Sequence, residues 1–365
     1  VQLPGWRRGE NEEVSMLRHL DLAMADAAEA GRMADLARLD AIKGGIQDDR
    51  TLLDRSIARA EASGDKFAMA YCAQRYGDNL GGHGQFEASL EHCARAVEFY
   101  GMQGDRLRQS LVMASGGRCY NARAGKLDQS LAFAGEVREN ADVLDNAELR
   151  AWCAMNAEPY YYMGLWDQAV VAAQDALPVA WEIGEWTVIS FSSAWLALAY
   201  SKLGQADNAQ RVLDRLFDEM PARIVRSQSM ALPYAQIARA EIYLAAGNYG
   251  EALDTVQQAL AAATRRSFRL EEVAAHRVLG QIREAMGDRA EADAAFRRSL
   301  ELLDDIQCPP ELAQTLLAYG RFRRGDNAQE DRALLERALR LFEEMKATGW
   351  IDETRIALAA ASPAS

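Results

Sequence analysis

Gly84-Gln85-Phe86-Glu87-Ala88-Ser89 is a phrase that recurs along this chain of 365 residues. Successive copies lie 41, 39, 40, 43 and 40 residues apart, and the later ones begin at Gly125, Gly164, Gly204, Gly247 and Gly287. Each copy starts with Gly, carries Asp, Asn, Glu or Gln within the next positions and reaches Ala or Ser at its sixth position. Self-similarity at such a period is the signature of a repeat protein, in which one supersecondary unit is used many times.

Each part of the phrase has a physical role at a junction between two helices. Gly suits the left-handed conformation that ends a helix, and a polar or acidic residue suits the free N–H groups that begin the next one. The small sixth residue lets the two helices pack closely, and small residues also recur seven positions before the Gly, at Gly77, Ala157, Ala197, Ala240 and Gly280. With only eight prolines in the chain, the pattern predicts antiparallel helical hairpins that bury their apolar faces against neighbouring hairpins.

These motifs resemble the tetratricopeptide-repeat superfamily over about residues 66–350. An aromatic residue often follows the upstream small residue by three positions, as in Tyr160, Tyr200 and Tyr243. The period near 40, longer than the standard 34, is similar to the arrays of maltose-regulator-like transcription factors and of multidomain ATPase and nucleotide-cyclase signalling proteins. The resemblance implies an all-α fold, a right-handed superhelical solenoid of about eight antiparallel helical hairpins.

The two ends of the chain are less regular than the middle. We expect residues 1–65 to form a degenerate N-terminal hairpin or cap with a break at Gly44-Gly45, and residues 66–350 to form the repeat array. Residues 351–365 are expected to hold the end of the last helix and a frayed tail from residue 357, after a longer loop over 325–331. No stretch has the composition of a flexible linker, which predicts one continuous superhelix.

Composition and charge exclude several classes of protein. Asp and Glu outnumber Lys and Arg by 54 to 41, a net charge of −13, which argues against nucleic-acid binding. No apolar run is long enough to cross a bilayer. The five cysteines are odd in number and never spaced as CxxC, which favours a reducing, cytoplasmic location. The missing initial Met suggests a fragment of a larger protein.

The sequence contains no motif typical of catalysis or cofactor binding. Gly125-Lys126 lacks the rest of a phosphate-binding loop. Cys72, His83, His92 and Cys93 are close in sequence, but Cys93 occupies a small-residue position of the repeat, so we interpret it as a buried hydrophobe rather than a zinc ligand. We therefore predict no catalytic residue, no metal and no cofactor.

Residues 151–200 hold ten of the 29 aromatic side chains of the chain. Tyr161 and Tyr162 share a helix with the core position Tyr160 but point elsewhere at 100° per residue, and Pro159 should kink that helix. In the repeat family that the motifs resemble, the first helix of each hairpin lines the concave face. This resemblance predicts a partner-binding surface formed by Gln74, Asp78, Arg123, Glu158, Tyr161, Tyr162, Lys202, Glu241, Arg277 and Gln281.

Two functions fit this sequence. One is a non-catalytic protein-interaction or ligand-sensing arm of a larger bacterial-type signalling or transcription regulator, whose partner includes a covalently attached signalling domain. The other is a free-standing adaptor that binds a peptide or protein in the concave groove. An enzyme hidden in the helical fold is disfavoured because function must be argued from a site, and the sequence shows none. The oligomeric state stays open.

Overall fold

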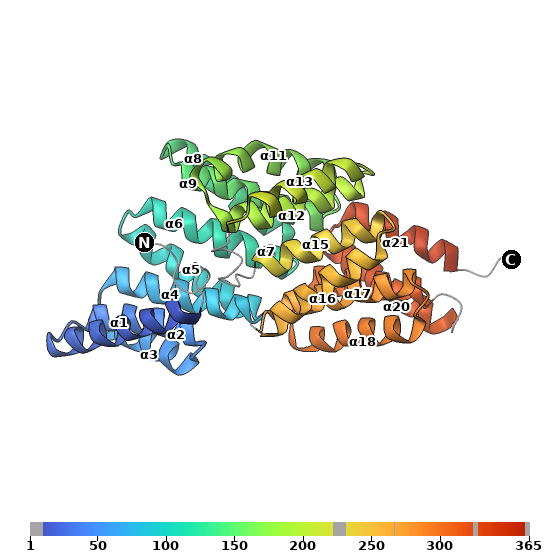
Figure 1. The fold of residues 1–365 in the computed structure, drawn as a ribbon. Coiled ribbons are helices and arrows are strands. Elements are labelled where there is room, and N and C mark those ends of the chain that lie inside the picture. The colour runs from blue at the N-terminus through green and yellow to red at the C-terminus, as the bar shows by residue number, and fades with distance from the viewer. Residues whose placement is uncertain (1–9, 222–230, 266, 324–327, 362–365) are drawn as a thin grey trace.

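The computed structural model describes residues 10–221, 231–265, 267–323 and 328–361, and every element in these ranges is helical. Eight antiparallel hairpins follow one another between α1 and α21 (Figure 1), which confirms the predicted all-α, right-handed superhelical solenoid. The first five hairpins pair α2 with α3, α4 with α5, α6–α7 with α8, α9–α10 with α11, and α12 with α13. The other three pair α15 with α16, α17 with α18, and α19 with α20.

The helices of the first half have the following bounds: α1 Glu10–Glu29, α2 Met33–Gln47, α3 Arg50–Ser63, α4 Lys66–Gly82, α5 Phe86–Met102, α6 Arg106–Val112, η1 Met113–Gly117, α7 Arg118–Arg123, α8 Leu127–Val143, α9 Ala147–Trp152, η2 Cys153–Asn156, α10 Ala157–Tyr162 and α11 Trp166–Ile183. Those of the second half are α12 Trp186–Lys202, α13 Ala206–Glu219, α15 Ala231–Ala245, α16 Tyr249–Arg265, α17 Arg269–Ala285, α18 Arg289–Asp305, α19 Pro309–Phe322, α20 Ala328–Glu344 and α21 Thr348–Ala361.

The repeated phrase performs the predicted roles. All six of its glycines have positive φ, between 71° and 83°, as a left-handed helix stop requires. The six small residues at its end are fully buried. At the first copy, the Ser89 hydroxyl donates to the Gly77 carbonyl oxygen at 2.7 Å, and a Cβ at Gly77 would lie 3.2 Å from the Ser89 carbonyl oxygen. The small residues therefore set how closely the two helices of a hairpin approach.

At both ends of the chain the helices are longer than predicted. The expected break at Gly44-Gly45 is wrong, because α2 continues to Gln47, and Gly44 packs where a Cβ would meet Leu53 at 3.0 Å. The frayed tail from residue 357 is also wrong, since α21 is helical to Ala361. The loop expected over 325–331 ends earlier, because α20 begins at Ala328. Residues 325–327 and 362–365 lie outside the described ranges.

The third and fourth hairpins depart from regular helix geometry. A π-helical turn, η1, separates α6 from α7, and a 3₁₀ turn, η2, separates α9 from α10. Pro159 has no N–H to offer the Met155 carbonyl, one turn before it. The Arg118 guanidinium takes that place, with Nη1 donating to the Met155 oxygen at 2.8 Å. The interruption predicted from Pro159 is confirmed, and a buried arginine from the neighbouring hairpin satisfies the freed carbonyl.

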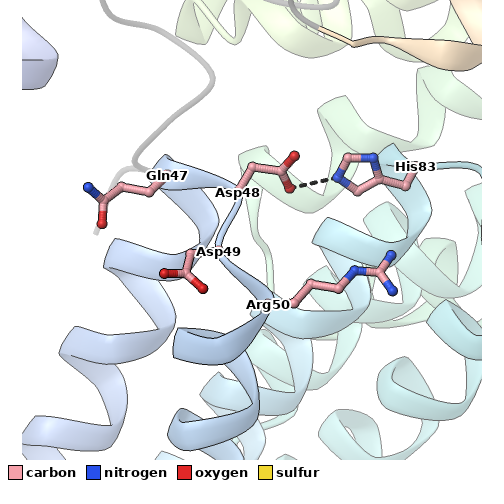
Figure 2. A pocket seen from close by; sticks show the side chains of 5 residues that line it. All are labelled: Gln47, Asp48, Asp49, Arg50 and His83. Carbon is pink, nitrogen blue, oxygen red and sulfur yellow. Dashed lines mark hydrogen bonds and ion pairs between the residues drawn. The ribbon is translucent and has the colours of Figure 1, made fainter.

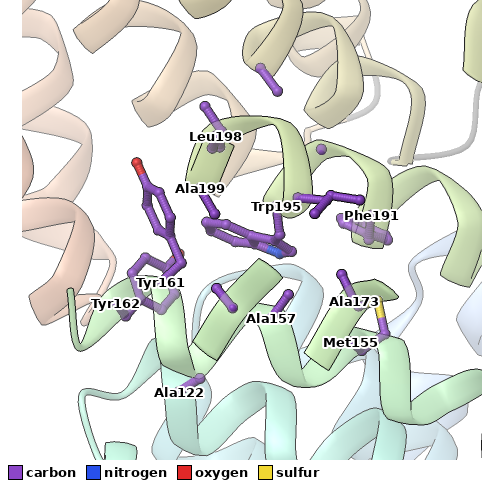
Figure 3. Packing of buried hydrophobic residues seen from close by; sticks show 14 of the residues in the cluster. Ala122, Met155, Ala157, Tyr161, Tyr162, Ala173, Phe191, Trp195, Leu198 and Ala199 are labelled. Carbon is purple, nitrogen blue, oxygen red and sulfur yellow. The ribbon is translucent and has the colours of Figure 1, made fainter. Parts of the chain in front are cut away.

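The superhelix closes on itself, because the last hairpins contact the middle ones. The Trp350 indole N–H donates to the Tyr161 carbonyl oxygen at 3.0 Å, across 189 residues of sequence. At a second point, a Cβ at Gly84 would lie 2.7 Å from Ile306. Figure 3 shows the resulting core, in which Tyr161, Tyr162 and Trp195 lie together. The inner face of the middle repeats is therefore the core of the molecule in this conformation.

Candidate functional site

Seven ionisable side chains gather on the inner face of the solenoid, and six of them are buried. They come from helices far apart in sequence, and we call the set the charged interior: Arg118, Arg123, Glu158, Glu241, Glu271, Arg277 and Glu311. Only Glu241 keeps part of its side chain, 21%, exposed. Three arginines thus stand against four glutamates in a region from which water is largely removed.

Two ion-pair groups organise this set. In the first, both oxygens of the fully buried Glu158 carboxylate are paired at 3.1 Å, one with Arg118 Nη1 and one with Arg123 Nε. In the second, Arg277 lies between two carboxylates, at 3.2 Å from Glu241 and 3.5 Å from Glu311. Glu311 Oε1 also accepts from the Tyr162 hydroxyl at 3.5 Å, so this tyrosine connects α10 to the second group.

Burial dominates the electrostatics of the carboxylates. It raises the pKa of Glu311 although Arg277 pulls it down, and it raises the pKa of Glu271 against the opposing effect of Arg123. Burial also opposes the Arg277 cation, but Glu241 and Glu311 outweigh it and raise the pKa of that guanidinium. Arg277 therefore stays charged, while the Glu271 and Glu311 carboxylates are held at a cost.

Several buried polar atoms of the inner face have no hydrogen-bond partner among the described residues: Arg118 Nη2, Trp195 Nε1, Glu271 Oε1, Arg277 Nε, Gln281 Oε1 and Glu311 Oε2. Native proteins leave few such atoms, and each costs about 1–3 kcal/mol. Beside them lies a cavity of about 10 Å³, lined in part by Tyr161, Tyr234 and Glu311, which is about the space of one water molecule. The interior thus carries unused donors and acceptors but little free volume.

The structure brings six of the ten predicted partner-binding residues into this interior: Arg123, Glu158, Tyr161, Tyr162, Glu241 and Arg277. Gln281 is half-buried on the same helix as Arg277. Lys202 lies at the closing contact instead, with Nζ 2.8 Å from Glu353 Oε1. Tyr161 and Tyr162 face the interior as predicted, yet their exposed fractions of 3% and 1% show that it is closed rather than an open groove.

The other two predicted residues lie towards the N-terminal end of the array. Gln74 and Asp78 are half-buried on α4, and Asp78 is 3.6 Å from Arg75. Burial raises the pKa of Asp78 to about 6 despite the nearby Arg75. No contact joins these two residues to the charged interior in the part of the chain that the structure describes, so they form a separate polar region of the inner face.

The sequence analysis missed Arg118, Glu271 and Glu311. Glu271 and Glu311 stand in the first turns of α17 and α19, where acidic residues normally favour the helix dipole in solvent. Arg118 directly follows the Met113–Gly117 stretch that becomes a π-helical turn. Nothing in the local pattern distinguishes these side chains from solvated ones, because their burial depends on hairpins about 40 to 200 residues away.

An open depression of about 710 Å³ lies at the turn between α2 and α3 (Figure 2). Asp48 accepts from Asn79 at 2.7 Å and contacts His83 Nε2 at 2.6 Å; burial opposes ionisation of Asp48, but these two hydrogen bonds lower its pKa. The Asp48–His83 contact joins α2 to the end of α4. His92 instead packs against Tyr76, with the ring centroids 4.5 Å apart, so the histidines and cysteines weighed as zinc ligands are not brought together.

No group of three or more His, Cys, Asp or Glu side chains in the described ranges is arranged to hold a metal ion. Among the helices that the structure describes, none combines the length and apolarity needed to span a bilayer.

Comparison with known proteins gives a match to one family model and a number of structures of similar fold, among them the following two. Residues 232–305 match the family model described as Tetratricopeptide repeat, and no curated protein sequence matches the chain. A Rap protein complexed with Competence and Sporulation Factor is 14% identical with a TM-score of 0.61, over 96% of this chain and 98% of that one. The apo form of the quorum sensor NprR from B. thuringiensis is 14% identical with a TM-score of 0.53, over 92% and 93%.

These comparisons agree with the repeat pattern and with the hairpin architecture. Residues 232–305 match tetratricopeptide repeats, as the motifs predict, and the chain as a whole has the fold of such repeat arrays. This fold is a protein-interaction scaffold, built from stacked hairpins with an extended inner surface, and such scaffolds are generally non-catalytic.

Proposed function

We propose that this chain is a non-catalytic ligand-sensing array that binds a peptide or protein segment in its charged interior. In this proposal it is a cytoplasmic regulatory arm that biases the pose of a signalling or transcription-regulating domain. The single observation that carries the proposal is the set of buried, partly unpartnered ionisable groups on the inner face. A scaffold with only a structural role has no need of such groups.

The buried ion pairs contribute little to the stability of the closed state. Buried ion pairs are often no more stable than an apolar core of the same volume, so Arg123, Glu158 and Arg277 are poor choices for stability alone. A bound segment that offers main-chain groups and charged side chains could pair with Glu271 Oε1, which has no hydrogen-bond partner among the described residues, and with Glu311 Oε2, which lies 3.5 Å from Arg277 Nε. Tyr161 and Tyr162 would add the large contact area and polar handle that binding centres use.

The structures of similar fold support sensing over passive scaffolding. The Rap protein is a complex with Competence and Sporulation Factor, and NprR is described as a quorum sensor. In both cases the similarity extends over nearly the whole of this chain and nearly the whole of the other protein's chain.

The alternative is a free-standing adaptor that binds its partner outside the closed interior. Gln74 and Asp78 favour it, because they are only half-buried at one end of the inner face, whereas Tyr161 and Tyr162 are fully buried. Selection of binding peptides that depend on Asp78 and not on Glu311 would choose this alternative.

A displayed library of random ten-residue peptides would test the proposal. Selected peptides should bind the Glu311→Gln variant about tenfold or more weakly than the wild type, since one charged contact of about 1.4 kcal/mol is lost. Glu301→Gln on α18 is the matched control, because Glu301 is exposed and pairs with the exposed Arg298 on the same helix. Equal affinity for the wild type and Glu311→Gln would refute the interior as the binding site.

Tyrosine variants need a conservative design. Because Tyr161 and Tyr162 are buried, alanine at either position would remove core packing along with any ligand contact. Phenylalanine keeps the ring and removes only the hydroxyl. Tyr162→Phe should weaken the binding of selected peptides that contact Glu311. The helical content measured by circular dichroism should stay unchanged.

A further inference from the structure

One of the contacts that close the superhelix lies on the first turns of α21, whereas another joins Gly84 to Ile306. Trp350 is 5% exposed and stacks on Phe342 of α20, with ring centroids 5.6 Å apart and an interplanar angle of 8°. Its edges meet Tyr161 at 5.7 Å and Trp166 at 5.9 Å between centroids. One indole thus fills the junction between the last described hairpin and the fourth.

Two glycines allow the backbones to meet beside this indole. A Cβ at Gly349 would lie 2.4 Å from the Gly164 carbonyl oxygen, closer than any real Cβ contact. Gly349 has no positive φ, whereas Gly164 has a φ of 72°. Glycine is therefore required at position 349 by the close approach alone and not by the backbone conformation.

Polar contacts surround the aromatic junction. Lys202 Nζ lies 3.9 Å from the centroid of the Trp350 ring and pairs with Glu353 at 2.8 Å. Further out, Lys346 pairs with Asp128 at 2.6 Å, and both side chains are well exposed. Exposed pairs of this kind add little to stability, so Trp350 and the glycine contact hold the junction.

Directly behind the junction lies the charged interior. Tyr161, which Trp350 covers, also lines the small cavity with Arg277 and Glu311. Removal of α21 from Tyr161 would therefore open a path to the buried charges. In the array α21 packs mainly on α20, so it can lift away without separating the other hairpins.

We propose that α21 is a latch: while Trp350 is seated against Tyr161 and Trp166 the interior is closed, and a ligand gains access when α21 lifts. The kind of ligand that enters rests on the proposed function, whereas the movement of α21 does not. Opening and closing of one packed element between two arrangements is the usual physical basis of such regulation.

Gly349→Ala should selectively disrupt the contact between α21 and the turn at Gly164. The second residue of α21 has a counterpart in Gly250, the second residue of α16, where an added Cβ would meet nothing within 4 Å. Both substitutions change helix propensity alike, so Gly250→Ala is a matched control. Only the change at position 349 forces two hairpins apart.

The native cysteines report the opening without any ligand. All five are buried, and Cys119 and Cys308 lie near Arg123 and Glu158, whereas Cys72 lies in a separate core near the N-terminus. N-ethylmaleimide modification, followed by mass spectrometry, should accelerate about tenfold or more at Cys119 and Cys308 in Gly349→Ala and stay unchanged at Cys72. Unchanged rates at Cys119 and Cys308, or an equal rise at Cys72, would overturn the latch.

A covalent tether tests the latch independently, in case Gly349→Ala does not fold. Asp128→Cys with Lys346→Cys, joined by a short bis-maleimide, would hold α21 down, and Glu87→Cys with Lys126→Cys would join an exposed pair in adjacent hairpins as a control. Only the first tether should slow modification of Cys119 and Cys308. Equal modification with and without that tether would contradict the latch. If the tether works but no peptide binds the interior, the proposed function fails and the latch stands.

Discussion

The hairpins α15–α18 and the hairpins formed by α6–α11 have nearly the same repeat period but differ in helix geometry. The first region is regular, it buries a compact apolar cluster around Val256 and Val278, and it is the part that the family model matches. The second region contains the π-helical and 3₁₀ turns and supplies Arg118, Arg123 and Glu158 to the interior. The first region also supplies Glu241, Glu271 and Arg277 to the interior, but from regular helices. Buried charges thus occur in both regions, and only in the second do they accompany a helix irregularity.

This difference shows how a repeat fold gains a site without losing its architecture. The turns at Gly125 and Gly164 keep their positive φ on either side of the irregular helices, so the hairpin connections are unaffected. Between the turns, Pro159 frees the carbonyl that Arg118 uses. Local helix irregularity is thus tied to a buried side chain, as is common for π and proline interruptions at functional positions.

The largest expected effect comes from breaking the ion-pair group in the irregular region. Arg118→Met removes one partner of the fully buried Glu158 and the donor to the Met155 carbonyl. The free energy of unfolding should fall by about 3–5 kcal/mol, measured by urea denaturation followed by circular dichroism.

The matched change in the regular region is Arg297→Met on α18. Arg297 pairs with Asp293, but its side chain is 61% exposed, so the loss should stay below about 1 kcal/mol. Similar losses for the two variants would mean that the regions do not differ in the way their charges are held.

In the regular region the limiting factor is apolar packing. A Cβ at Gly280 would lie 2.9 Å from the buried Phe296 ring, so Gly280→Ala should cost about 1–3 kcal/mol through overpacking. Gly250→Ala, with open space around it, should be neutral or stabilising by up to about 1 kcal/mol. Thermal unfolding of the two variants checks this, and a stabilising Gly280→Ala would show that the helices can separate freely.

The smallest expected effect is a difference in pH dependence. Burial lowers the pKa of His276, in α17, from 6.5 to about 4, with help from Arg298. The unfolded chain then binds a proton below pH 6.5 that the folded chain refuses, so stability is lost as the pH falls from 6.5 to 4. For this half-buried side chain the loss should be about 1 kcal/mol, and His276→Gln should remove it.

The contribution of Glu311 in the charged interior to stability should depend on pH with the opposite sign to that of His276. Because burial raises the pKa of Glu311, its ionised form costs stability above that pKa and the cost disappears as the pH falls through it. The pH slope of the unfolding free energy between pH 4 and pH 8 should therefore change in opposite directions, becoming less positive in His276→Gln and more positive in Glu311→Gln than in the wild type. Slopes that change in the same direction would contradict the opposite pH effects assigned to these two side chains.

Much of the fold follows from local patterns. The turn glycines, the small residues after them and the helix type are set within about ten residues, where backbone conformation and packing of adjacent helices act directly. The helix interruption at Pro159 could be predicted from the sequence for the same reason. The errors at Gly44-Gly45 and beyond residue 357 arose because glycine and the chain end were interpreted by local propensity, while contacts such as that of Gly44 with Leu53 kept the helix intact.

The site was only partly predictable. The repeat register placed Arg123, Glu158, Tyr161, Tyr162 and Arg277 on the inner face, because a fixed spacing carries a face from one hairpin to the next. It could not show that this face is closed. Glu311 and Arg118 were missed because an acidic first turn and an arginine beside two glycines look the same whether exposed or buried.

The hairpin, its period and part of the set of side chains on the inner face can be predicted from the sequence, since these depend on neighbours in the chain. The tertiary structure alone decided that α21 returns to α10, that Trp350 covers Tyr161, and that charged groups are thereby removed from water. The physical reason is that superhelical closure sums small rotations over many repeats. No single stretch of sequence encodes that sum, and a contact across 189 residues depends on all of it.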